Sequence, residues 1–194
     1  GKVTISNIMG APMYRGIMIK GISSAVEMSN LQFNYSCYVS SHVSMRMQSA
    51  IDVEISNSQN VSIDNMLTFG AYSGITTKPA YSSRRVNLKA TNLNLEGQKA
   101  ISLLSSGNYD IYNSYFFMVN FAEAAVQNEF RGIEIKQDSN SSHAPNYNFT
   151  NCVIQNPVIF SQSNNSKWND INLELELAGN ATVKFNNLQN WGMD

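Results

Sequence analysis

The chain has 194 residues, of which 43% are hydrophobic and 14% are charged, and its formal net charge is -1. A charge this close to zero excludes the polybasic surface that binds nucleic acid or an acidic membrane. No apolar run approaches the roughly 18 residues of a membrane-spanning helix. We therefore expect no nucleic-acid partner and no membrane insertion.

A short alternating motif recurs along the chain: an apolar residue, any residue, a second apolar residue, any residue and then Asn. The clear copies are Val3-Ile5-Asn7, Val26-Met28-Asn30, Val61-Ile63-Asn65, Tyr109-Ile111-Asn113 and Tyr147-Phe149-Asn151. An imperfect copy lies at Val86 and Leu88, where Ala90 takes the Asn position and Asn92 follows late. Alternation of this kind predicts a strand with one buried face.

A second motif alternates with the first: a small residue, then Ile, any residue and usually an apolar residue. Its copies begin at Gly16, Ala50, Gly74, Ala100 and Gly132, with a loose sixth copy at Pro157, Val158 and Phe160. Further apolar residues follow the Asn of the first motif, at Leu31 and Phe33, Leu67 and Phe69, Leu93 and Leu95, Tyr115 and Phe117, and Val153. We interpret these residues as the inward side of a third short strand.

The spacing of the copies indicates a solenoid, because repeats of roughly 20 to 50 residues are typical of that architecture. Three short strands per repeat and no helical period predict an all-β parallel β-helix of about six repeats over residues 1–165. The recurring Asn suits the bend after the first strand, because Asn tolerates a left-handed backbone. Stacked Asn side chains are expected to bond from one repeat to the next.

The pattern changes near the C-terminus. Ile171, Leu173, Leu175 and Leu177 alternate with polar residues, Gly179 and Asn180 supply a turn signal, and Val183 and Phe185 follow. Two alternating segments joined by such a turn predict a β-hairpin. We expect residues 166–194 to form a C-terminal cap or an oligomerisation element.

Acidic residues occupy outward positions of the first motif, where stacked repeats bring side chains into columns. Glu27 and Asp64 fall on adjacent repeats with a diagonal offset, and Asp110 falls two repeats beyond Asp64. Glycosidases hold two carboxylates about 5 to 9.5 Å apart. The sequence therefore predicts Glu27, Asp64 and Asp110 as candidate catalytic acid and base, with ordinary solvated acids as the alternative.

Three other residues are candidates for substrate binding. Tyr112 lies in an outward column near Asp110, and Arg131 directly precedes a copy of the second motif, where it could meet an acidic group of a polysaccharide. Glu134 is an outward acid of the same strand as Arg131. The alternative for each is a solvated polar side chain.

Neither a metal site nor a disulfide is predicted. His42 and His143 fall in loops of remote repeats, so they do not form a metal cluster or a catalytic triad. Cys37 and Cys152 are four repeats apart, on the order of 19 Å, which is too far for a disulfide. We expect no cofactor.

The repeat of alternating strand, Asn and Gly-Ile strand resembles the right-handed parallel β-helix of pectin-lyase-like proteins, and among them that of bacteriophage tailspikes. The resemblance covers about residues 3–165 and includes the abundance of Asn and Ser. It implies a homotrimer on a virus tail, outside the cell, that binds a bacterial surface polysaccharide and often hydrolyses it. The calcium-binding Asp cluster and catalytic basic residues of pectate lyases are not matched.

Two other readings remain open. The chain could be a non-catalytic module, in which the same coil serves as a receptor-binding part or a structural shaft of a viral tail fibre. It could also belong to a bacterial surface adhesin. Release of short sugar fragments from a glycan would separate the enzyme from both alternatives.

Overall fold

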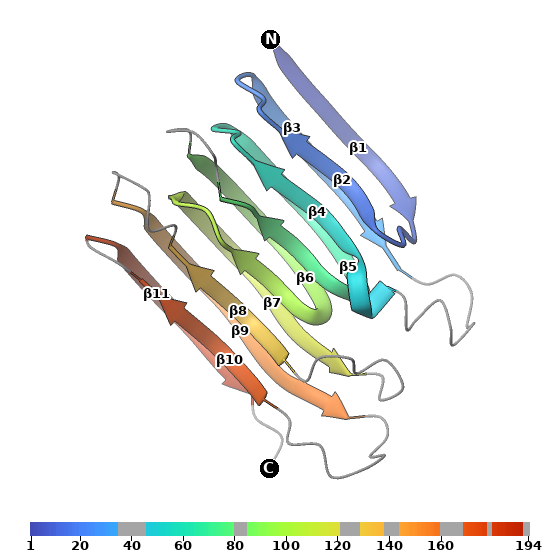
Figure 1. Ribbon diagram of the computed structural model, residues 1–194, viewed down its shortest axis with the longest axis vertical. Coiled ribbons are helices and arrows are strands. Elements are labelled where there is room, and N and C mark those ends of the chain that lie inside the picture. Colours follow the sequence, from blue (N-terminus) through green and yellow to red (C-terminus); the bar gives the residue numbers. More distant parts are fainter. Residues whose placement is uncertain are drawn as a thin grey trace.

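The structure, a computed structural model, describes residues 1–34, 46–79, 85–120, 129–137, 144–159, 169–177 and 180–191. These residues are almost entirely strand and form one sheet of eleven strands (Figure 1). The strands are β1 Lys2–Gly10, β2 Arg15–Lys20, β3 Ala25–Phe33, β4 Ile51–Ser56, β5 Val61–Thr77, β6 Val86–Leu103, β7 Gly107–Asn120, β8 Glu129–Lys136, β9 Asn146–Ile159, β10 Asn169–Glu176 and β11 Thr182–Trp191. A helical turn at 46–49 is the only helix in these ranges, and none of their helices is long and apolar enough to cross a membrane.

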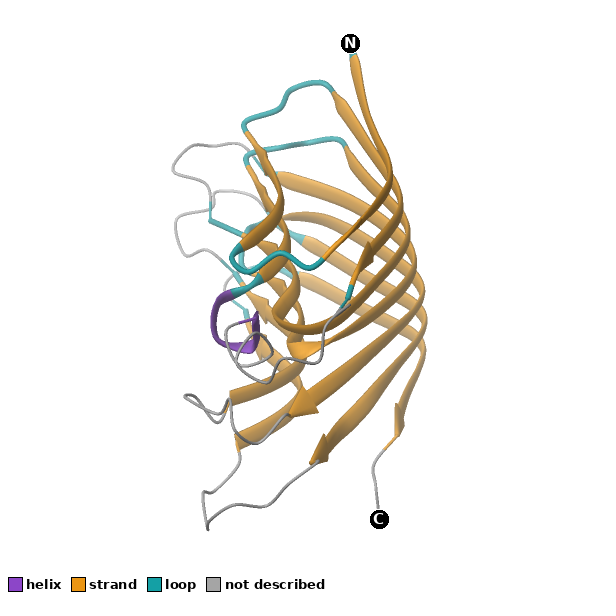
Figure 2. Cartoon of the chain, turned by 90° about the vertical axis from the view of Figure 1, so that its right-hand side faces the viewer, coloured by secondary structure: helices purple, strands orange, loops and turns teal. Residues whose placement is uncertain are grey.

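The strands form two rows that share the long strands β5 and β6. The first row has the order β1-β3-β5-β6-β7-β9-β11, and the second row has the order β2-β4-β5-β6-β8-β10. Every strand pair in the described ranges is parallel. The long strands bend partway along, at the register shift between Thr68 and Ala71 in β5, so the two rows face one another (Figure 2). The expected all-β, parallel organisation is confirmed.

Buried apolar side chains from both rows form one core between them. Aromatic rings continue the stacking of the strands inside this core. The rings of Tyr109 and Tyr147 stack with their centroids 5.0 Å apart, and those of Phe149 and Phe185 stack at 5.3 Å. The buried Tyr109 hydroxyl donates a hydrogen bond to the Ser105 carbonyl oxygen, so its polar end is satisfied inside the core.

In the first row, the alternating motif and the apolar segment after it form one continuous strand. The Asn between them has a left-handed backbone, as at Asn30 with a φ of 53°. After this residue the inward positions are the first and the third. The residues buried there are Leu31, Phe33, Met66, Thr68, Leu93, Leu95, Ser114, Phe116, Cys152 and Ile154.

The predicted inward residues are therefore only partly correct. Leu67, Phe69, Tyr115, Phe117 and Val153 are partly exposed, because the left-handed Asn shifts the inward positions by one residue from those expected. The expected separate third strand is also absent from the described first row, where each of these segments continues the strand that precedes it.

The copy of the motif in β6 lies two residues from the predicted register. Leu88 pairs with Val61 on one side and with Tyr109 on the other. The motif is therefore Leu88-Ala90-Asn92, and Asn92, with a φ of 56°, occupies the usual left-handed position. The copy that looked imperfect in the sequence is regular.

The second row contains a similar shift of two residues in β4. Val53, rather than Ile51, pairs with Ile17 and Ile75. This register aligns Glu54, rather than Asp52, with Met18 and Thr76, and Asp52 is fully buried.

The predicted C-terminal hairpin is wrong. β10 pairs in parallel with β8, and β11 pairs in parallel with β9, so both strands continue the two rows. The physical reason is visible in β11, where Val183, Phe185 and Asn187 repeat the first motif and Asn187 has a φ of 56°. The loose sixth copy predicted at Pro157 and Val158 belongs to β9 instead and pairs with β7, while Phe160 lies outside the described residues.

Candidate functional site

A shallow open groove of about 360 Å³ crosses the beginnings of four strands in the first row. It spans β3, β5, β6 and β7, and eight of its twelve lining residues are polar or charged. The lining residues are Ala25, Val26, Glu27, Gln59, Asn60, Val61, Ser62, Asn87, Leu88, Lys89, Asn108 and Asp110. The groove thus contains two of the three predicted catalytic acids.

Each predicted acid has a polar partner. Lys2 on β1 forms an ion pair with Glu27 at 2.6 Å, and Asn148 on β9 donates a hydrogen bond to Asp110 at 2.8 Å. Asp64 lies outside the groove lining and accepts a hydrogen bond from the Asn92 side chain at 3.0 Å. The partners of Glu27 and Asp110 lie on the far sides of these two residues, so the two carboxylates are not drawn toward each other.

The strand register sets the separation of these acids. Glu27 and Asp110 belong to one column, three strand spacings or roughly 14 Å apart along the stack. This exceeds the window of about 5 to 9.5 Å for paired carboxylates in glycosidases. Glu27 and Asp64 are closer, because they lie on neighbouring strands two residues out of line, roughly 8 Å between backbones. Of the predicted acids, they are the better spaced pair.

Side-chain amides form an ordered ladder along the groove. The Asn87 oxygen accepts hydrogen bonds at 3.2 Å from both the backbone and the side-chain nitrogen of Asn108. The Asn108 oxygen in turn accepts one from Asn146 at 3.1 Å. These fixed amides provide both donors and acceptors, which suits a ligand with many hydroxyl groups.

Lys89 and the amides of Asn87 and Asn108 line the groove and were not among the residues predicted from the sequence. Lys89 pairs with Ser62 and Asp110 in the central column of the groove. The signal that places it there is Asn92, whose left-handed position fixes the register of β6.

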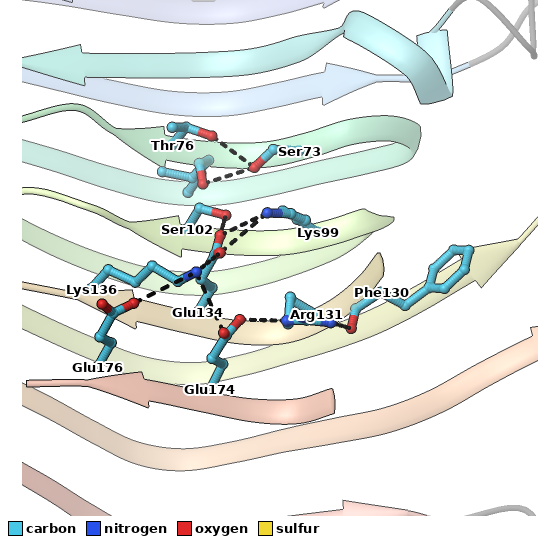
Figure 3. Close-up of polar contacts among 11 residues, drawn as sticks. Ser73, Thr76, Lys99, Ser102, Phe130, Arg131, Glu134, Lys136, Glu174 and Glu176 are labelled. Carbon is cyan, nitrogen blue, oxygen red and sulfur yellow. Dashed lines mark hydrogen bonds and ion pairs between the residues drawn. The ribbon is translucent and has the colours of Figure 1, made fainter. Parts of the chain in front are cut away.

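The predicted binding residues Arg131 and Glu134 lie in the second row, within a charged cluster on β6, β8 and β10 (Figure 3). Glu134 is 2% exposed. Its carboxylate accepts hydrogen bonds from Lys99 at 3.1 and 3.2 Å and from the Ser102 hydroxyl at 2.7 Å. Lys136 lies 3.3 Å away on its other side.

The same cluster continues to β10. Arg131 bonds to Glu174, and Lys136 lies 3.4 Å from Glu174 and 3.8 Å from Glu176. Three cations and three carboxylates therefore balance one another across three strands. The ion pairs connect the three strands, and the buried carboxylate of Glu134 is bonded to residues of the cluster itself.

Electrostatics support a structural role for this cluster. Burial acts to raise the pKa of Glu134, but the Ser102 hydroxyl and the ammonium groups of Lys99 and Lys136 outweigh burial and hold the pKa below its usual range. Burial is likewise outweighed at Glu174, whose pKa is lowered by Arg131 and Lys136. Carboxyl groups held in the charged form are poorly suited to act as general acids.

A second buried ion pair joins Arg46 of the helical turn to Asp52 of β4. Both oxygens of Asp52 accept from Arg46 at 3.1 Å, and both side chains are fully buried. Burial raises the pKa of Asp52 to about 7, against the opposing effect of Arg46. Arg46 also donates to the carbonyl oxygens of Pro12 and Phe69, so it ties three segments together. The pair is closed to solvent and therefore to substrate.

The predicted site residues do not gather in one place. Tyr112 pairs with Thr91 and Thr150, in the column that contains Asp64, while Arg131 and Glu134 lie in the other row. The described residues contain no group of three or more side chains suited to hold a metal ion. His42, His143 and Cys37 lie outside the described ranges, and Cys152 is a free, buried thiol.

Comparisons of the chain with known protein families, with curated proteins and with solved structures gave no match.

Proposed function

We propose that this chain is a right-handed parallel β-helix that binds bacterial surface polysaccharide, as part of a trimeric tailspike-like protein on a virus tail. The observation that carries the proposal is the polar groove of the first row, in which fixed amides lie between Glu27, Lys89 and Asp110. Recognition of the glycan is the function that this geometry supports best.

The strand pairing supports the coiled form of the proposed fold. Each strand of the first row pairs in parallel with the next strand of that row along the chain. Connections between parallel strands of one sheet are right-handed in nearly all proteins. Two facing rows around a common core are also what a coil of stacked repeats produces.

The groove chemistry supports a carbohydrate ligand. Eight of its twelve lining residues carry amides, a hydroxyl or charges of both signs, the other four are apolar, and its volume of about 360 Å³ suits one or two sugar units rather than a protein surface. Amide groups both donate and accept hydrogen bonds, as do sugar hydroxyls.

The test is binding of the purified chain to a panel of capsular polysaccharides and lipopolysaccharide O-chains, with the solution mass measured by light scattering. Lys89→Ala and Asp110→Asn should weaken binding at least tenfold, whereas Glu176→Gln, an exposed acid of the second row, should leave it unchanged. A chain that binds no member of the panel, or binds equally well in all three variants, contradicts the proposal.

Hydrolysis of the bound glycan is the second candidate function. It is favoured by the diagonal placement of Glu27 and Asp64 on neighbouring strands, roughly 8 Å apart between backbones. Asp110, the third predicted acid, lines the groove together with Glu27, whereas Asp64 is not part of the lining.

Release of reducing sugar from the same panel tests this candidate. If the chain is a hydrolase, Glu27→Gln or Asp64→Asn should abolish release and preserve binding. Binding by the unaltered chain without any release would assign it to the non-catalytic class of glycan-binding shafts.

A further inference from the structure

A second surface of the first row carries aromatic rings. After the left-handed Asn, the outward positions of β6, β7, β9 and β11 align in two columns. One column contains Asn94, Tyr115, Val153 and Gln189, and the other contains Glu96, Phe117, Gln155 and Trp191. These positions lie beyond the bend at the left-handed Asn and share no residue with the groove lining.

Three rings of these columns form a cluster, which we name the aromatic patch: Tyr115, Phe117 and Trp191. The ring of Tyr115 contacts that of Trp191 edge to face, with centroids 6.3 Å apart, and that of Phe117 at 6.1 Å. Trp191 is 52% exposed, and the other two rings are partly exposed. Large rings that point away from the core are typical of binding surfaces, because they offer a rigid apolar face.

Polar groups with unused bonding capacity adjoin the rings. Asn94 pairs with Tyr115 across the strands, and its side-chain oxygen has no hydrogen-bond partner in the described part of the chain. A buried acceptor left unpaired in a folded protein calls for an explanation such as a bound water or ligand. Glu96 pairs with Phe117 and forms no ion pair with any described residue.

The patch carries no positive charge. The outward residues of its two columns are rings, amides, one valine and the single carboxylate of Glu96. Glu96 and Tyr115 lie diagonally across one strand pair. Burial raises the pKa of Glu96, and both burial and the charge of Glu96 raise the pKa of Tyr115. A surface of this kind disfavours anionic sugars and accepts neutral or amino sugars.

We propose that the aromatic patch is a second glycan-binding subsite, in which the apolar face of a neutral or basic pyranose stacks on Tyr115 and Trp191 while its hydroxyls bond to Asn94 and Glu96. A pyranose combines an apolar C–H face with a rim of hydroxyl groups, and the patch combines rings with amides and a carboxylate. The inference rests on the proposed function for the class of ligand, but the location of the subsite and its preference for neutral or basic sugars are independent of the groove.

The experiment measures binding of neutral and acidic members of the same polysaccharide panel. Trp191→Ala and Tyr115→Ala should each weaken binding of a neutral glycan at least tenfold, while Tyr115→Phe, which keeps the ring, should stay within twofold. Tyr14→Ala is the matched control, because Tyr14 is 65% exposed and lies between β1 and β2 at the other end of the stack. In a Trp168→Phe background, the fluorescence of Trp191 should change when the neutral glycan binds.

Each outcome decides a different point. Unchanged binding in Trp191→Ala and Tyr115→Ala, together with weakened binding in Asp110→Asn, overturns the aromatic patch and preserves the proposed function. Absence of binding to the whole panel overturns both. A change of solution mass in Trp191→Ala assigns the rings to a contact between subunits and also overturns the subsite.

Discussion

At the scale of single residues, the first row depends on Asn in a left-handed backbone. Every strand of the row has one: Asn7, Asn30, Asn65, Asn92, Asn113, Asn151 and Asn187, with φ between 50° and 59°. Most of these amides also bond from strand to strand, as Asn30 does to Asn7 at 3.1 Å and Asn65 to Asn30 at 2.9 Å. One residue type therefore supplies both the bend and the bond between strands.

Substitution of Asn30 separates these two contributions. Asn30→Gly removes the side-chain bonds but permits the left-handed backbone, whereas Asn30→Ala removes the bonds and adds the strain of a Cβ in that conformation. We expect Asn30→Ala to lower the free energy of unfolding by about 1 kcal/mol more than Asn30→Gly. Urea denaturation measures the difference. Equal stabilities of the two variants would show that the left-handed backbone at this position does not strain a residue with a Cβ.

The thiol of Cys152 offers a probe of the same strands. Cys152 is 1% exposed, in the buried position directly after the left-handed Asn151, and burial raises the pKa of its thiol. Since the thiolate is the reactive form, we expect slow labelling by iodoacetamide at neutral pH and fast labelling in urea. A Cys37→Ser background leaves Cys152 as the only thiol; rapid labelling of the folded chain would contradict its burial.

At the scale of the elements, hydrophobic alternation predicted the strands of the first row and their parallel order, but not every register. Alternation has a period of two, so a slip of two residues keeps the same inward and outward pattern. In β6 only Asn92 fixes the register, and β4 contains no left-handed Asn, so alternation alone does not decide whether Ile51 or Val53 aligns with Ile17. The hairpin prediction failed for a related reason, because local alternation does not identify the partner of a strand.

The sequence predicted the acids of the candidate site correctly as outward residues, but it did not predict the exposed aromatic rings. The outward positions of Glu27, Asp64 and Asp110 followed from alternation and agree with the strand pairing. The rings of Tyr115 and Phe117 were expected in the core, because their hydrophobicity suggests burial. These rings point outward because Asn113 has a left-handed backbone, which exchanges the inward and outward positions of the residues that follow it.

The charged cluster of β6, β8 and β10 should stabilise the second row. Glu134→Gln leaves Lys99 and Lys136 without their buried partner and should lower the free energy of unfolding by about 3 kcal/mol. Glu176→Gln is the control, because Glu176 is 75% exposed and its ion pair with Lys136 should contribute little. If both variants lose the same free energy of unfolding, burial does not determine how much an ion pair of this cluster contributes to stability.

The same cluster predicts a dependence on pH. The pKa values of Glu134 and Glu174 are lower in the folded state than their usual value of 4.5. The unfolded chain therefore binds more protons in acid, and this stabilisation is present at neutral pH and lost as the pH falls below 4.5 through the folded-state pKa values. Thermal unfolding from pH 6 to pH 3 should show a smaller decline for Glu134→Gln than for the unaltered chain.

At the scale of the whole molecule, the two rows repeat along one axis, and among the described strands the first and last of each row pair on one side only. In the described residues β1 pairs with β3 alone, and its inward residue Val3 is 42% exposed. The exposed edge of a parallel stack is a template for another strand. A second copy that adds its last strand to that edge leaves its own first strand unpaired, so head-to-tail addition is open-ended.

For a purified chain of residues 1–194, this geometry predicts association that grows with concentration, separately from any trimer formed through the sides of the stack. Val3→Lys places a charge in the inward column at the open edge and should remove most of the growth in mass seen by light scattering. Thr4→Lys adds the same charge at the neighbouring outward position and should have a much smaller effect, because outward side chains of successive strands do not enter the core. If both variants reduce association equally, net charge rather than the open edge controls it.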